Sequence, residues 1–212
     1  SLASYYYKSS YKKLLIQGTV SGWYDCGYTA SELSKLTSKT TSYDPTWTVL
    51  EGAISWYKKT YNTDCTEFDN NSDGLIDGVW LVYSAPDYGN DSTLAKLDNK
   101  DVFWAYTFSD YGVSEASTNN PVGYHYSWAS YDFMYSGQYD NNALDSHTYV
   151  HETGHLMGLA DYYVASEDEK YTKQYPNIDP MGAIDMMDYN VIDHNSYSKM
   201  CLGWTSPYLA EE

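Results

Sequence analysis

Residues 151–161 read H-E-T-G-H-L-M-G-L-A-D, a pattern that combines a helix, its end and four side chains able to bind metal or transfer protons. On a helix, residues four apart share a face, so His151 and His155 can direct two imidazole rings at one ion, which suits Zn²⁺. Glu152 is then placed to act as the general base that activates water for peptide hydrolysis. The alternative is a helix that carries two histidines by chance.

The end of this helix offers a third ligand. Gly158 is a typical helix-ending residue, and a turn after it can return Asp161 to the same ion. Three protein ligands leave one coordination position open, which is a property of catalytic zinc sites. If Asp161 does not bind zinc, we expect it to hydrogen-bond to a ligand or to bind calcium instead.

The motif H-E-x-x-H-x-x-G-x-x-D resembles that of the metzincin clan of zinc peptidases, in which the last position is more often histidine. Aspartate at position 161 is similar to the variant found in immune inhibitor A-type secreted bacterial metallopeptidases. Three further stretches resemble that family in the same order, at residues 11–24, 69–83 and 185–204. The resemblance implies a zinc peptidase catalytic domain excised from a longer precursor (a zymogen) that also carries a propeptide and accessory domains.

The resemblance also implies a Met-turn, a methionine that lies beneath the metal-binding histidines. Met181, Met186 and Met187 are the candidates. Met187 fits best, because the polar pair Asp188-Tyr189 follows it, whereas ordinary core packing is favoured for Met181. Tyr189 is the candidate for a hydrogen-bond donor to the transition state.

A second metal site is predicted in residues 69–77, which read D-N-N-S-D-G-L-I-D. The oxygen-bearing side chains alternate as in the first part of an EF-hand calcium loop, and glycine allows the sharp turn in the middle. The twelfth position is Trp80 instead of glutamate and no helix is expected to follow, so we expect a short calcium loop rather than an EF-hand. An Asn/Asp-Gly turn without an ion is the alternative. The candidate calcium residues are Asp69, Asn71, Asp73, Leu75 and Asp77.

The rest of the chain predicts an α+β fold, for which the resemblance implies a metzincin-like arrangement. We expect a twisted mixed sheet with a backing helix and an active-site helix, followed by a small irregular C-terminal lobe that ends in a helix. The two lobes would span about 1–158 and 159–212 of a single catalytic domain. Apolar spacing and capping residues predict helices at about 4–9, 45–61, 143–157 and 195–202. Apolar runs predict strands at about 13–20, 78–83, 102–106 and 123–128.

Composition narrows the choice of partners. The chain has 29 acidic residues against 12 basic ones, for a net charge of −17, and it contains no arginine. We therefore expect no nucleic-acid partner and no binding to an anionic membrane, and no apolar run is long enough for a membrane span. The 26 tyrosines among many polar residues suggest a secreted or cell-surface bacterial protein. The 3 cysteines allow at most one disulfide.

Together these features predict a secreted, monomeric zinc endopeptidase whose protein or peptide substrate lies extended in a cleft between the lobes. Without arginine the chain has no bidentate clamp for a terminal carboxylate, which favours an endopeptidase over a carboxypeptidase. Two alternatives stay open. One is a non-catalytic, metal-stabilised adhesive or glycan-binding module, which would not need Glu152. The other is a zinc hydrolase of non-peptide amides.

Overall fold

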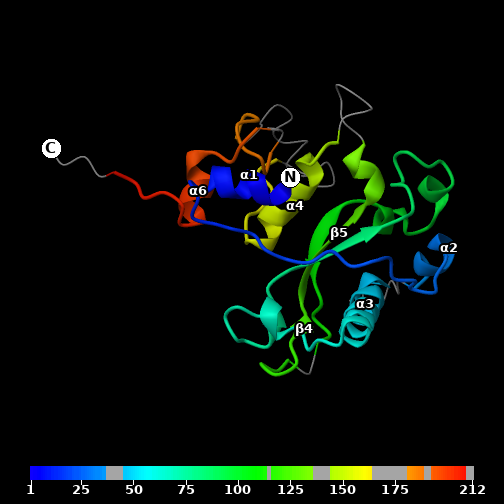
Figure 1. The fold of residues 1–212 in the computed structure, drawn as a ribbon. Coiled ribbons are helices and arrows are strands. Elements are labelled where there is room, and N and C mark those ends of the chain that lie inside the picture. Colours follow the sequence, from blue (N-terminus) through cyan, green and yellow to red (C-terminus); the bar gives the residue numbers. More distant parts are fainter. Residues whose placement is uncertain (37–44, 114–115, 136–143, 164–180, 189–191, 209–212) are drawn as a thin grey trace. The chain divides into compact units, whose positions relative to one another are not determined.

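The structure, a computed structural model, describes residues 1–36, 45–113, 116–135, 144–163, 181–188 and 192–208 (Figure 1). The chain divides into two compact units, of which the first joins residues 1–17 to residues 146–212 and the second is residues 18–145. Each unit has a hydrophobic core of its own.

A three-stranded mixed sheet forms the centre of the second unit. Its strands are β2 (Val79–Tyr83), β3 (Tyr106–Ser109) and β5 (His125–Ser130). The middle strand, β5, runs parallel to β2 on one side and antiparallel to β3 on the other. Trp128 marks the register, because it lies opposite both Leu81 and Tyr106. After His125 every residue of β5 is buried, as expected for a central strand.

The long helix α3 (Pro45–Tyr61) packs beside these strands in the second unit. Its apolar stripe includes Leu50 and Ile54, whose side chains lie against Gly123. Thr46 and Tyr126 join the helix to the sheet through a hydroxyl–hydroxyl hydrogen bond of 2.6 Å. A short parallel pair is made by β1 (Leu75–Ile76) and β4 (Val122–Gly123). The unit also contains α2 (Ala30–Leu33) and 3₁₀ turns at Thr66–Phe68, Leu94–Lys96, Lys100–Phe103 and Tyr131–Met134.

Helices dominate the described part of the first unit. They are α1 (Leu2–Ser9), α4 (His147–Leu156) and α6 (Ser196–Cys201). The helix α1 packs on α4, where the Tyr6 hydroxyl donates a hydrogen bond of 2.6 Å to the carbonyl of Val150. These two residues share a buried core with Met186 and Trp204. The Asn195 side chain caps α6 by accepting hydrogen bonds from the first backbone N–H groups of that helix.

All four expected helices are confirmed, with some ends shifted by a few residues. The N-terminal helix begins at Leu2, and the helix from 45 to 61 has the expected bounds. The metal-motif helix begins at His147 rather than near 143, and the last helix spans 196–201. Gly158 follows α4 with a φ of +91°, a backbone conformation that glycine adopts readily, so it ends the helix as predicted.

Two of the four expected strands are wrong. Residues 13–20 form no regular structure, because Leu15 is 60% exposed and Val20 fully exposed, so this apolar run buries too little side chain to hold a strand. Val102 and Phe103 lie in a 3₁₀ turn, and both side chains are buried. In a strand, the side chains of two consecutive residues would point to opposite faces of the sheet. The strands expected at 78–83 and 123–128 are confirmed as β2 and β5.

The division into units also differs from the expected lobes. The helix α4 groups with α1 and α6 and not with the sheet, so the division falls at residue 146, before α4, and not near 158, after it. The architecture itself is mixed α+β, with a small mixed sheet and a few helices. Within the described ranges, no helix has the length and apolar character needed to cross a bilayer.

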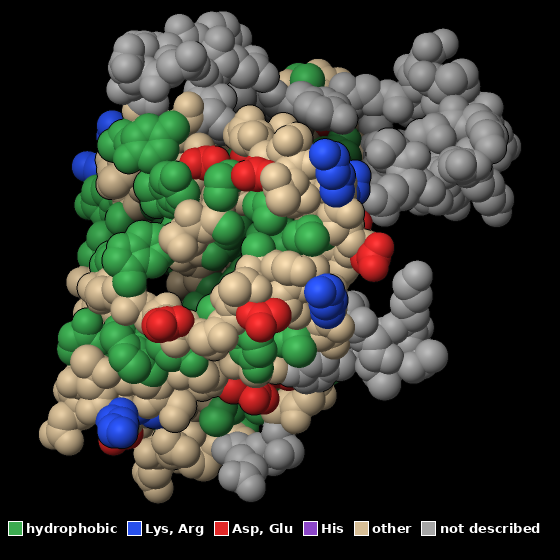
Figure 2. All heavy atoms as spheres, turned by 90° about the vertical axis from the view of Figure 1, so that its right-hand side faces the viewer, with side chains coloured by type: hydrophobic (Ala, Val, Ile, Leu, Met, Phe, Trp, Pro, Cys, Tyr) green, Lys and Arg blue, Asp and Glu red, His purple; other side chains and the backbone are tan. Residues whose placement is uncertain are grey.

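The surface shown in Figure 2 is mostly uncharged. Hydrophobic and other uncharged side chains cover most of this face, and acidic and lysine side chains are scattered among them. The described residues drawn there form no broad basic area. All three cysteines are unpaired, with Cys65 buried and Cys201 exposed.

Candidate metal centre

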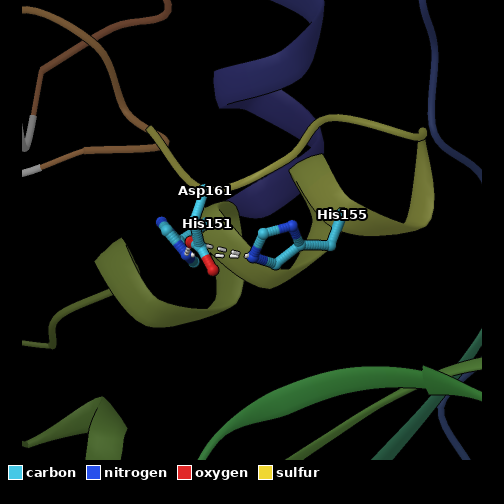
Figure 3. Close-up of side chains that lie close together, drawn as sticks. All are labelled: His151, His155 and Asp161. Carbon is cyan, nitrogen blue, oxygen red and sulfur yellow. Dashed lines mark hydrogen bonds and ion pairs between the residues drawn. The ribbon is translucent and has the colours of Figure 1, made fainter. Parts of the chain in front are cut away.

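The two predicted histidine ligands, His151 and His155, lie one turn apart on the same face of α4 (Figure 3). After the helix, Gly158 redirects the chain, and Asp161 comes to lie beside both imidazole rings. The side chains of the histidines are 12% and 19% exposed and that of Asp161 is 40% exposed. The group is thus shielded by protein but reachable from solvent.

Three potential ligand atoms form a nearly equilateral triangle in this group. The Oδ1 atom of Asp161 lies 3.0 Å from Nε2 of His151 and 3.2 Å from Nε2 of His155. The two Nε2 atoms are 3.1 Å apart. In a tetrahedral zinc site with bonds of about 2.0 Å, ligand atoms are separated by about 3.3 Å. The triangle therefore fits three ligands of one tetrahedral ion, with a fourth position left over.

The hydrogen bond made by Nδ1 of each ring leaves Nε2 of that ring available as a metal ligand. Nδ1 of His151 lies 3.0 Å from the carbonyl oxygen of Met186, and Nδ1 of His155 lies 2.8 Å from that of Leu159. A carbonyl can only accept, so each Nδ1 carries a hydrogen, and a ring in its neutral form then presents a lone pair at Nε2. With both rings neutral, two lone pairs and a carboxylate oxygen converge, and this arrangement is compensated either by a metal cation or by a proton that an imidazole donates to Asp161.

Burial and hydrogen bonding act in opposite directions on the pKa values of these groups. Burial lowers the pKa of each histidine, but hydrogen bonds to Asp161 and to the backbone carbonyls outweigh it, so both pKa values rise. For Asp161, burial raises the pKa, but the two imidazoles lower it by a larger amount, so that the pKa lies well below its usual range. The group therefore attracts positive charge. Among the described residues, it is the one cluster of three or more His, Cys, Asp or Glu whose ligand atoms converge in this way.

Glu152, the predicted general base, is buried in α4 beside His151. Its negative charge contributes to raising the pKa of both His151 and His155. The structure thus brings the three ligand candidates together and places the general-base candidate next to His151 in the same helix, and its role as a base stays a prediction.

Met187, the predicted Met-turn residue, lies under α4. Its side chain is fully buried, and its sulfur packs so closely on Gly154 that a Cβ at position 154 would overlap it. Met186, the neighbouring candidate, is also buried but contributes its backbone carbonyl to His151. Met181 is only half-buried, and Tyr189 lies outside the described residues. The position of Met187 agrees with the role expected from the resemblance, which stays a prediction.

In the predicted calcium loop, the side chains bind the backbone of their own turn. Asp69 is buried, and its carboxylate accepts from the N–H groups of Asp73 and Gly74 at 3.0 and 2.9 Å. Similar bonds run from the N–H of Asp73 to Asn71, from that of Leu75 to Asp73, and from that of Asn70 to Asp77. The described acidic groups of this loop do not converge on one point. These bonds suit an ion-free turn as well as a calcium loop, so calcium stays a prediction.

Two buried residues near the site, Asp185 and His194, were not predicted from the sequence as functional. Asp185 is fully buried and accepts a hydrogen bond from the N–H of Met187, and the His194 ring lies near Gly154 of α4. The available signal was the spacing of Asp185 two residues before Met187, because an aspartate commonly accepts from the N–H two residues on. Neither a scan against protein-family models nor a search of curated proteins found a match to this chain.

Proposed function

We propose that this chain is the catalytic domain of a secreted bacterial zinc endopeptidase of metzincin type. The observation that carries the proposal is the convergence of three acceptor atoms, from His151, His155 and Asp161, with spacings that fit a tetrahedral ion. Peptide as the substrate is supported by the sequence motif that holds these residues, since it resembles that of immune inhibitor A-type metallopeptidases.

The protein groups have distinct parts in the proposed hydrolysis. A zinc ion bound here would supply a Lewis acid that polarises the scissile carbonyl and makes water a better nucleophile. Glu152 would accept the proton of the attacking water and deliver it to the leaving amine. The two histidines would bind the ion through Nε2 in their neutral form, because their Nδ1 hydrogens are directed at backbone carbonyls. Asp161 would offset part of the charge of the ion.

The composition supports an endopeptidase with a preference against acidic substrates. The chain has no arginine to hold a terminal carboxylate in a bidentate clamp, and its net charge is −17. We propose that the substrate binds in an extended conformation, and that Met187 supports the metal ligands from below. The proposed protein acts outside the cell as a monomer, with zinc as its catalytic metal.

The proposal is tested by hydrolysis of casein with zinc-loaded wild type and with Glu152→Ala. We expect wild type to cleave casein, and the variant to bind zinc with wild-type affinity but to lose activity by a factor of about 10² to 10⁴, the usual contribution of a general base. Glu67→Ala is the matched control, because that exposed glutamate lies outside the site. Zinc binding without cleavage of casein or of a peptide library by wild type contradicts a peptidase. Full activity of Glu152→Ala contradicts the role of Glu152.

A further inference from the structure

A buried aspartate outside the metal-binding motif, Asp185, organises the segment beneath α4. Its carboxylate is fully buried and accepts hydrogen bonds from the N–H of Met187 at 2.8 Å, the N–H of Asn195 at 2.7 Å and the hydroxyl of Ser198 at 2.6 Å. Nδ1 of His194 lies 3.5 Å from the same carboxylate. A buried charge is tolerated only where hydrogen-bond donors compensate for lost hydration, so this carboxylate holds its donor groups in fixed positions.

One peptide unit links Asp185 to a metal ligand. The N–H of Met187, which donates to Asp185, belongs to the same planar group as the carbonyl of Met186. In a trans peptide the N–H and C=O point in opposite directions, and this carbonyl is the acceptor for Nδ1 of His151. By holding one end of the peptide plane, Asp185 directs its other end at the ring of His151.

The same segment also holds the chain beside another ligand. The carbonyl of Met187 accepts a hydrogen bond of 2.8 Å from the N–H of Tyr162, the residue that follows Asp161. Two successive carbonyls of the segment thus contact His151 and the chain at Asp161, while the sulfur of Met187 packs on Gly154 between the histidines. Loss of the carboxylate at 185 would free all three contacts together.

We infer that Asp185 is a positioning residue for the metal site, acting on His151 through the peptide plane between Met186 and Met187. The inference rests on the proposed function for the identity of the metal. Partners that fix the orientation of a metal-binding histidine typically change metal affinity by about 10- to 100-fold when removed. Asp185 would act in this way indirectly, since it holds the peptide group of the Met186 carbonyl and does not contact the His151 ring itself.

The test is zinc affinity measured by competition with a fluorescent chelator, together with the absorption spectrum of the cobalt-substituted protein. We expect Asp185→Asn to lower zinc affinity by about 10- to 100-fold and to alter the cobalt spectrum. The matched control is Asp193→Asn, because the Asp193 carboxylate accepts from Ser9, Lys199 and the N–H of His194 in the same unit rather than from Met187. We expect its zinc affinity to stay within about twofold of wild type, even if its thermal stability falls.

A folded Asp185→Asn with wild-type zinc affinity and cobalt spectrum overturns the inference, and so does an equal loss in both variants. If Asp185→Asn does not fold, hydrogen exchange in wild type decides. Because coupling is reciprocal, zinc should slow exchange of the Met187 and Asn195 amides by about the same 10- to 100-fold factor. Unchanged exchange at both amides contradicts the inference. Wild type that binds no zinc contradicts the proposed function instead, so the two failures are distinguishable.

Discussion

The sulfur of Met187 fills the space where a side chain at position 154 would stand, so Gly154 and Met187 are complementary in shape. Gly154 lies inside α4 between the two histidines, where glycine is otherwise unfavourable by about 1 kcal/mol relative to alanine. The close approach of the methionine explains why glycine occupies this position. For replacement by alanine, helix propensity predicts a more stable protein, whereas the contact with Met187 predicts a less stable one.

Gly154→Ala should therefore destabilise the protein despite the better helix propensity of alanine. Overpacking of this kind costs about 1–3 kcal/mol, which is a fall of roughly 2–12 °C in melting temperature for a chain of this size. Thermal unfolding of the zinc-free protein measures it. Gly22→Ala is the control, since nothing lies near its Cβ position, and its melting temperature should hardly change. A rise in the melting temperature of Gly154→Ala would show that Met187 moves aside easily.

Replacement of Asp161 tests whether it is a ligand or only a hydrogen-bond partner. We expect Asp161→Ala to lower zinc affinity by about 100-fold or more, because one of three ligand atoms is lost. Asp161→His should recover most of that affinity, since imidazole can occupy the same coordination position. Chelator competition measures both, with Asp64→Ala as a control at an exposed aspartate of the other unit. If Asp161→Ala keeps zinc affinity within about tenfold of wild type, Asp161 acts outside the coordination sphere.

The part of the site carried by local spacing could be predicted from the sequence. His151 and His155 meet because residues four apart share a helix face, and the return of Asp161 follows from the glycine that ends the helix. Each of these steps depends on a few consecutive residues and on backbone geometry that is the same in every helix.

The support beneath the site could not be predicted in the same way. The Asp185 carboxylate binds Asn195 and Ser198, which lie 10 and 13 residues further along the chain outside any shared helix. The direction of the Met186 carbonyl depends on the orientation of one peptide plane, which no repeating pattern in the sequence indicates. Residues 13–20 show the converse. Their apolar run favours a strand, but no strand in the described ranges pairs with it.

Acid should weaken the zinc-free protein through Asp185. Burial raises the pKa of this carboxyl, but the nearby His194 ring and hydrogen bonds from Ser198, Met187 and Asn195 outweigh it and lower the pKa to about 2. An acid with a lowered pKa stabilises the fold above its unfolded pKa of about 3.9, and this contribution, about 2 kcal/mol, is lost as pH falls from about 4 through 2. Urea unfolding of wild type and Asp185→Asn measures it. Wild type should be more stable at pH 7, and the difference should shrink towards pH 2. A constant difference contradicts the assignment.

Calcium should stabilise the zinc-loaded protein if the loop from Asp69 to Asp77 binds it. At a calcium concentration 100 times the dissociation constant, binding adds about 2.7 kcal/mol, which is roughly 5–10 °C in melting temperature. Asp73→Ala should remove the response, because that exposed carboxylate is a candidate ligand and also accepts the N–H of Leu75. Asp64→Asn, an exposed aspartate outside the loop, should respond like wild type. An unchanged melting temperature on adding calcium to wild type would assign the segment as a hydrogen-bonded turn, with Asp69 held by its own backbone N–H donors.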